Sequence, residues 1–266
     1  MSIPFDSPNR VIARGLSKWY SVSVRKRVSL QEVFHEKWNK LCRREQAKEF
    51  LDDELAVSAG PKPGTLWALR DLSFEIAKGE VLGVVGSNGA GKSTLVRLLS
   101  RLTGPSAGEA LIEGKIASVL EVGSGFHPEL TVRENALLNG VFLGMRKFEV
   151  NDRMDAILDF SELKRCIDTP VKKISHGMQY RLAVSVALHS DSDFTLMDEV
   201  LEVADFQFEE KCFEKISQAQ SQGRSFLFVS HNLSQVRSIC NRILWLDQGR
   251  MKQLGKPADV LEAYRN

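Results

Sequence analysis

The sequence predicts an α/β fold built around a parallel sheet, and three observations lead to this prediction. Val81–Val85 and Phe226–Val229 are short and almost continuously apolar, as expected of parallel strands that are buried on both faces. A glycine-rich turn follows the first of these runs, and Thr94–Arg101 then has helical periodicity. A third apolar strand, Phe194–Met197, follows another helical segment. Strands that alternate with helices favour a parallel sheet.

The composition is that of an ordinary globular protein. The 266 residues carry a formal net charge of +2, with 43% hydrophobic and 26% charged side chains. So small a net charge gives no indication of nucleic-acid binding. No apolar stretch approaches the ~20 residues of a membrane-spanning helix, and residues 1–10 lack the pattern of a signal peptide. Any role at a membrane is therefore expected to pass through a partner or a surface helix. The four cysteines form no C-x-x-C pair, which is typical of reduced structural thiols.

Two strands, Val11–Ser17 and Trp67–Ile76, flank a segment of different character. Between residues 25 and 48 there are eight Lys and Arg against three Glu, and apolar residues recur at helical spacing. We therefore expect a basic amphipathic helix over about residues 25–52. Such a helix suits contact with a membrane surface or a transmembrane partner, and equally it could pack on the protein's own strands.

The glycine-rich turn matches the pattern G-x-x-x-x-G-K-[ST] of a phosphate-binding loop. Its backbone N–H groups, together with the positive end of the following helix, would cradle nucleotide phosphates. Lys92 is expected to reach the β- and γ-phosphates, and the Ser93 hydroxyl is expected to bind Mg²⁺. The nucleotide-binding residues predicted here are Gly86, Ser87, Asn88, Gly89, Ala90, Gly91, Lys92, Ser93 and Thr94. The loop alone does not distinguish a kinase, a GTPase and an ATPase.

Two acidic residues end the strand Phe194–Met197 and indicate hydrolysis. Beside a phosphate loop, Asp198 would hold Mg²⁺ through its water shell, and Glu199 would polarise an attacking water molecule. Solvated acids at the end of a strand would give the same pattern. His231 follows the strand Phe226–Ser230, and in that position it would contact the γ-phosphate and orient water. A histidine with a purely structural role is the alternative.

A second candidate anion site precedes the helical segment Tyr180–His189. Ser175 and Gly177 offer a hydroxyl and an accessible backbone N–H at a helix N-terminus. A simple helix cap at Ser175 would explain the serine equally well.

The chain resembles the ATP-binding subunits of ABC transporters in the order of its motifs. These are the phosphate loop, Ile174–Gln179, the pair Asp198-Glu199 and His231. The resemblance covers nearly the whole chain. It implies a P-loop NTPase (RecA-like) core with an antiparallel β subdomain and a helical subdomain over about residues 130–180, within one domain of residues 1–266. It also implies that ATP and Mg²⁺ lie between two copies of the chain, so that a monomer would hydrolyse ATP poorly.

The resemblance also assigns roles to single residues. Ser175 and Gly177 would bind the γ-phosphate held by the other copy. Glu199 would be the catalytic base, and His231 the histidine that senses the γ-phosphate. Asp205 falls in the position of the family's D-loop.

An aromatic residue after the first strand stacks on adenine in this family. Tyr20 is our choice for that residue, and Trp19 is the second choice. Packing in the core would be the simpler explanation for either side chain.

Several stretches are more similar to the branch of the family that exports polysaccharides, such as O-antigen, capsule or teichoic acid chains. They are Leu120–Thr131, Arg133–Asn135, Gly177–Leu182, Asp198–Asp205 and Lys211-Cys212. This similarity implies a separate polytopic membrane subunit as partner and a peripheral location on the cytoplasmic face of the membrane. Some relatives carry a C-terminal sugar-binding domain, for which the residues after His231 leave no room.

Three positions depart from the family pattern. Glu121 stands where most members have the glutamine of the Q-loop, and it is a candidate ligand of Mg²⁺ or water. His176 replaces a small residue in the signature, which would tune the site completed by the second copy. Ala204 replaces the glycine of the D-loop, which would stiffen that loop.

Other functions are less consistent with the sequence. Soluble ABC-type ATPases of translation or DNA repair usually carry two cassettes or a long coiled-coil insertion, and this chain has neither. A P-loop kinase has no need of Ser175–Gln179, and the guanine-reading N-K-x-D of a GTPase is missing. A regulator that binds ATP without hydrolysing it would not need both Glu199 and His231.

Overall fold

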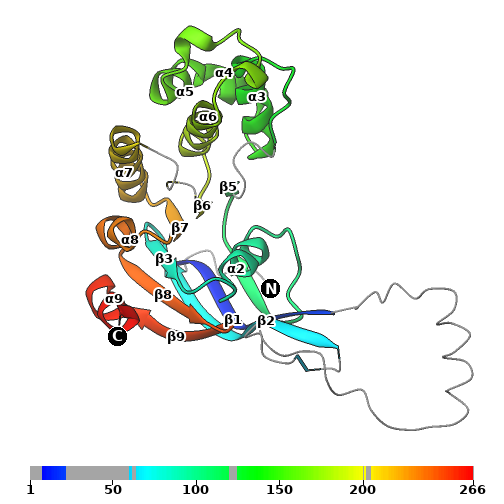
Figure 1. Cartoon of the computed structure of the whole chain (residues 1–266), viewed down its shortest axis with the longest axis vertical. Coiled ribbons are helices and arrows are strands. Elements are labelled where there is room, and N and C mark those ends of the chain that lie inside the picture. The colour runs from blue at the N-terminus through cyan, green and yellow to red at the C-terminus, as the bar shows by residue number, and fades with distance from the viewer. Residues whose placement is uncertain are drawn as a thin grey trace, which may run out of the picture.

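The computed structural model describes residues 8–21, 60–61, 64–119, 125–199, 201 and 205–265. The helix expected over residues 25–52 lies outside the described residues, and so do Glu121 and Ala204. Figure 1 shows two regions in the described chain: a group of helices at one end and two sheets with their covering helices at the other.

A six-stranded sheet forms the centre of the larger region. Its first five strands are parallel and the last one is antiparallel to its neighbour. In spatial order the strands are β5 (Ile116–Val119), β6 (Phe194–Asp198), β7 (Ser225–Val229), β3 (Val81–Val85), β8 (Arg242–Asp247) and β9 (Arg250–Gly255). The parallel pairing places the C-terminal ends of β6, β7 and β3 at the same edge of the sheet.

Strand β3 illustrates why these runs are apolar throughout. All five of its residues are buried, because successive side chains enter two different cores. Val81 and Val85 pack with helices α7 (Phe206–Ser221), α8 (Leu233–Ile239) and α9 (Pro257–Arg265) on one face. Leu82 and Val84 pack on the other face, against α2 (Lys92–Leu99) and a second sheet.

The second sheet is antiparallel and has the order β2-β1-β4. Its strands are β1 (Asn9–Ser21), β2 (Thr65–Ala77) and β4 (Ala107–Ile112). The first two strands are longer than the sequence predicts, because their ends pair with each other beyond the apolar residues. Trp19 and Tyr20 therefore lie within β1, opposite Trp67 and Leu66 of β2.

The helices at the other end of the molecule enclose a core of their own, which contains Val132, Ile157 and Leu182. They are α3 (Val132–Phe142), α4 (Lys147–Asp152), α5 (Met154–Ser161), the short 3₁₀ turns η1 (Lys164–Cys166) and η2 (Val171–Lys173), and α6 (His176–Leu188). Helix α3 starts with a capping box, in which Glu134 N donates to Thr131 Oγ1 and Thr131 N donates to Glu134 Oε2.

The structure confirms the predicted fold class and corrects several boundaries. Helix α6 begins at His176, not near Tyr180, because Ser175 caps it by accepting a hydrogen bond from Met178 N at 3.2 Å. Helix α2 begins at Lys92, two residues before the predicted start. In the part of the chain that the structure describes, no helix is both long and apolar enough to cross a membrane.

Gly83 in β3 gives a test of the packing between the central sheet and α8. A Cβ added there would lie 2.8 Å from Cys240 Sγ and 2.9 Å from Val236 Cγ1, both of them buried. We expect Gly83→Ala to lower the free energy of unfolding by about 2 kcal/mol, because overpacking forces the neighbours to shift. Gly104→Ala is the control, because a Cβ there meets nothing within 4 Å. Equal urea midpoints for the two variants would contradict this packing.

Candidate functional site

The glycine-rich loop occupies the turn between β3 and α2, at the C-terminal edge of the parallel sheet. Two of its glycines are required by close approach to other parts of the chain. A Cβ on Gly86 would lie 2.4 Å from Leu246 O, and one on Gly91 would lie 2.5 Å from Ala68 O. Gly91 also has φ 104°, in the left-handed region that favours glycine. The loop is therefore held tightly between β8 and β2.

The following helix begins without a side-chain cap, because its N-cap residue is Gly91. Its first backbone N–H groups therefore remain available to an anion. Lys92 is buried, and its Nζ donates to Gly86 O at 2.8 Å and to Ser87 O at 3.1 Å. The ammonium group thus lies against the backbone of the loop, at the place where phosphates would add negative charge.

Asp198 ends β6 beside this loop and carries a buried oxygen, Oδ1, without a hydrogen-bond partner among the described residues. The pKa of this carboxyl is raised to about 6, chiefly by burial and secondly by the nearby charge of Glu199. The charge of Lys92 and a hydrogen bond with Ser93 act in the opposite direction. A buried carboxylate with a free oxygen, next to a serine hydroxyl, is a suitable acceptor for a hydrated cation.

Glu199 directly follows β6 with φ 54°, and its backbone N–H donates to Val229 O at 2.9 Å. This left-handed conformation directs the chain away from the strand. The Glu199 carboxylate oxygen Oε1 lies 2.8 Å from His231 Nε2. The structure therefore brings together the two residues that the sequence analysis named as catalytic.

A cavity of about 340 Å³ opens between the loop and the antiparallel sheet. The predicted residues that line it are Tyr20, Asn88, Gly89, Gly91, Lys92, Ser93, Thr94 and Glu199. Leu66, Trp67 and Ala68 of β2 also line it, and these three were missed because nothing in the sequence marks β2 as part of a site. Trp19 contacts the ring of Trp67 edge-on, with centroids 5.2 Å apart, and does not line the cavity itself.

Gly86, Ser87 and Ala90 complete the loop without lining the cavity, and neither Ser175 nor Gly177 lines it. Ser175 and His176 are exposed at the start of α6. A Cβ added to Gly177 would meet only Ser175 Oγ, at 3.9 Å. Within the described part of the chain, the start of α6 is therefore exposed at Ser175 and His176.

Asp205 caps α7 and pairs with Arg181 of α6. The hydrogen bond from Phe208 N, followed by the one from Arg181, lowers the pKa of the Asp205 carboxyl. Arg181 Nη1 also lies 2.5 Å from Glu162, which pairs in turn with Lys211. This network joins α6 to the end of α5 and to α7.

Sequence reasoning missed Gln235, which is buried at the start of α8. Its Oε1 accepts a hydrogen bond from Ser230 Oγ at 2.9 Å, and its Nε2 donates to Glu209 Oε2 at 2.9 Å. Nε2 also lies 3.4 Å from Leu201 O. Gln235 therefore fixes the segment that carries His231 to the chain that follows Glu199.

Comparisons with known proteins agree on one family. The family model described as ABC transporter matches residues 69–202. An O-antigen export system ATP-binding protein of Klebsiella pneumoniae is 43% identical over 198 residues, which are 74% of this chain and 80% of that protein. An O-antigen export system ATP-binding protein of Myxococcus xanthus is also 43% identical, over 74% of this chain and 45% of that protein.

A teichoic acids export ATP-binding protein of Listeria monocytogenes is 37% identical over 210 residues, which are 79% of this chain and 62% of that protein. Among solved structures, a dimeric ATP-binding cassette in a post-hydrolysis state bound to ADP and Pi has a TM-score of 0.69 and 22% identity. It covers 93% of this chain and 98% of the solved one.

The raised pKa of Asp198 predicts how the stability of the nucleotide-free protein changes with pH. The carboxyl binds a proton more tightly in the folded than in the unfolded chain, so its contribution is greatest below about pH 4 and is lost as the pH rises through about 6. We expect Asp198→Asn to be more stable than the wild type at pH 8 by about 1 kcal/mol, since solvent partly screens the charge. This advantage should disappear near pH 4. Urea unfolding at both pH values measures it, and a difference independent of pH would contradict the buried charge.

Proposed function

Because this chain belongs to the ABC transporter family, we propose that it is an ATP-binding and ATP-hydrolysing subunit in which two copies enclose two ATP molecules with Mg²⁺. One observation carries the proposal. Lys92, Ser93 and Glu199 line one cavity, and beside it lie the ring of His231 and the Asp198 oxygen that has no partner among the described residues.

The residues around the loop fit a magnesium nucleotide. The uncapped start of α2 and the ammonium of Lys92 provide donors for phosphate oxygens. The Ser93 hydroxyl and the Asp198 carboxylate would hold the metal, directly and through water. No group of three His, Cys, Asp or Glu among the described residues could hold a metal ion. This agrees with Mg²⁺, which keeps several waters and takes oxygens from phosphate.

Glu199 is the proposed general base. Glu199 lines the same cavity as Lys92 and Ser93, and its carboxylate would accept a proton from water attacking the γ-phosphate. His231, at 2.8 Å from this carboxylate, would orient it and contact the γ-phosphate. Bound Mg²⁺ would supply charge that stabilises the leaving phosphates.

A second copy of the chain is needed to complete the site. Ser175 is exposed and Gly177 is half-buried at the N-terminus of α6, and neither is among the residues that line the cavity of their own chain. We propose that they bind the γ-phosphate held by the other copy, as the positive end of a helix would. Asp205, tied to the same helix through Arg181, would lie at this interface.

Two aromatic side chains line the part of the cavity away from the phosphate loop. Tyr20 is 41% exposed, and Trp67 lies on the neighbouring strand. We propose that Tyr20 stacks on adenine, with Trp67 forming an adjacent wall of the base site. Trp19 would support Trp67 through its edge-on contact.

The proposed cargo is a lipid-linked polysaccharide, moved through a separate polytopic membrane subunit at the cytoplasmic face. The names of the relatives support this, since they concern O-antigen and teichoic acid export. Exposed apolar side chains at the helical end would contact the membrane subunit. They are Val141 and Phe142 of α3 and Phe148 of α4, which are 46%, 68% and 56% exposed. Buried Asn135 holds the adjoining loop, since its Nδ2 donates to the carbonyls of His127, Leu130 and Thr131.

Glu199→Gln tests the proposed base. We expect the variant to bind ATP about as tightly as the wild type but to lose at least about 100-fold in turnover, because the amide cannot accept the proton. The ATP-bound dimer should accumulate on size exclusion chromatography. Lys92→Ala is the matched control, and it should lose binding itself. Turnover of Glu199→Gln close to the wild-type value would show that the base is another residue.

The same variant tests the cargo in the cell of origin. Replacing the native copy with Glu199→Gln should remove the surface polysaccharide, and lipid-linked polymer should accumulate inside, because synthesis continues while transport stops. Surface labelling and extraction of lipid-linked glycans measure the two pools. An unchanged surface polymer would exclude this cargo without affecting the ATPase assignment.

Mixing two inactive variants tests whether one copy completes the site of the other. Gly177→Glu places a carboxylate near the partner's γ-phosphate with room for its Cβ, and Lys92→Ala disables the loop. Each variant alone should be inactive. An equal mixture should recover up to about a quarter of wild-type activity, because half of the dimers contain one intact site. No recovery in a mixture that forms heterodimers would contradict the shared site.

A further inference from the structure

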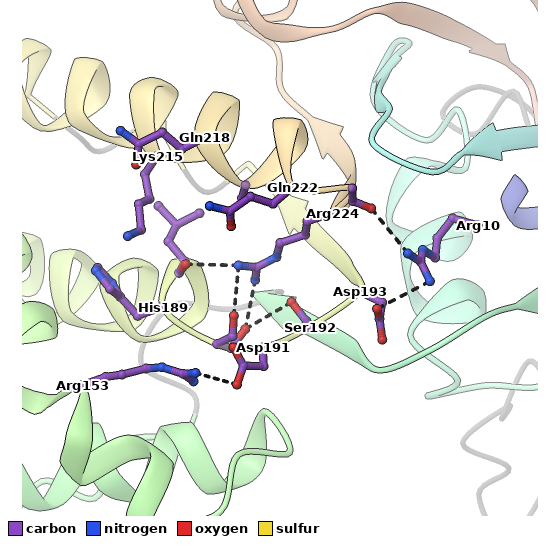
Figure 2. Close-up of a pocket in the computed structure, with 14 residues that line it drawn as sticks. Arg10, Arg153, His189, Asp191, Ser192, Asp193, Lys215, Gln218, Gln222 and Arg224 are labelled. Carbon is purple, nitrogen blue, oxygen red and sulfur yellow. Dashed lines mark hydrogen bonds and ion pairs between the residues drawn. The ribbon is translucent and has the colours of Figure 1, made fainter. Parts of the chain in front are cut away.

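A larger cleft of about 430 Å³ lies at the opposite edge of the parallel sheet from the phosphate loop. Asp193 and Arg224 line it, and they directly precede the first residues of β6 and β7. Its other walls come from the end of α6, the C-terminal half of α7, Arg153 between α4 and α5, and Arg10 of β1. Figure 2 shows Arg153 and Arg10 on the two sides of this cleft, with Arg224 between them.

Positive charge predominates in the cleft. Arg10, Arg153, Lys215 and Arg224 line it, against the carboxylates of Asp191 and Asp193. Burial lowers the pKa of His189, the remaining titratable group of the lining, and so favours its neutral form. The lining residues therefore carry two more positive than negative charges at neutral pH.

Among the described residues, no carboxylate forms a hydrogen bond or an ion pair with Arg224. Its guanidinium is buried and donates five hydrogen bonds of 2.7–3.1 Å, all to neutral oxygens. These acceptors are the carbonyls of Ala187, Leu188 and Ser190 and the hydroxyls of Ser190 and Thr195. Because charge in a poorly solvated position acts strongly on its surroundings, Arg224 makes the floor of the cleft electropositive.

The two outer arginines retain donors that the described residues do not satisfy. Arg10 is 8% exposed, and its buried Nε has no hydrogen-bond partner among the described residues. Arg153 pairs through Nη2 with Asp191 at 2.5 Å, while its buried Nη1 likewise has no partner in the described part of the chain. The contacts of Arg10 with Asp193, Glu113 and Gly223 are long, at 3.4–3.9 Å.

We propose that this cleft binds a small anion with at least two phosphate groups. Guanidinium groups on two sides of the cleft, an ammonium at Lys215 and an electropositive floor suit phosphate oxygens. A volume of 430 Å³ lies within the range of small-molecule sites and exceeds the needs of a single phosphate. Such an anion would bridge the helical end, through Arg153, to the antiparallel sheet, through Arg10.

The test uses inorganic pyrophosphate as the probe and isothermal titration calorimetry as the measurement. Every protein carries Lys92→Ala, and EDTA is present, so that the phosphate loop contributes little to the measured binding of pyrophosphate. We expect saturable binding with a Kd below about 1 mM, and weaker binding of orthophosphate. Lys215→Gln and Arg153→Gln should each weaken pyrophosphate binding about tenfold, because a charge-assisted contact is lost.

Two further variants make the result independent of folding defects. Asp191→Asn should strengthen binding severalfold, since it removes a competing carboxylate and releases Arg153. Lys172→Gln removes an equal charge from a surface pair with Glu129, outside the cleft, and should leave the Kd unchanged. Absence of saturable binding, or one Kd shared by all the variants, would overturn the proposal.

Discussion

The parallel register of β6, β7 and β3 is the constraint on which the candidate site depends. Asp198 pairs with Val229, and Val84 pairs with the same residue from the other side of β7. The residues that follow these strands, namely Glu199, His231 and the phosphate loop, are thereby brought to one edge although they are far apart in the sequence. A slip of the register by one residue would turn Asp198 to the other face of the sheet.

Several charged groups lie at this edge in poorly solvated positions. Contacts with the surrounding chain limit the free-energy cost of burying them. Lys92 lies against loop carbonyls, Ser93 contacts Asp198, and His231 contacts Glu199. Only one oxygen of Asp198 remains without a partner among the described residues. The site is therefore largely preorganised, and the hydrated cation proposed above would supply the partner for this oxygen.

Local sequence predicted the parts of the fold that depend on local interactions. The loop at Gly86–Ser93 was predicted from its pattern of glycine and lysine residues. The strands beside it were predicted from their continuous apolar residues, which reflect burial on both faces. Helix α6 was predicted to begin at Tyr180, although a cap at Ser175 was one of two interpretations of that serine, because the residue suits an anion site and a helix cap equally well. Trp67, Arg181 and Gln235 were missed for another reason. Their contacts with Trp19, Asp205 and Glu209, respectively, connect residues between 24 and 48 positions apart in the chain, and no short motif records these pairs.

The position of Ser175 and Gly177 has a consequence for subunits that are not assembled. Neither residue is among those that line the cavity beside the phosphate loop of its own chain. If each site is completed by a second copy, as proposed, newly made subunits without a partner would hydrolyse little ATP even when ATP is abundant. The rate of ATP hydrolysis in the cell would thus depend on the number of assembled transporters and not on the amount of the subunit produced.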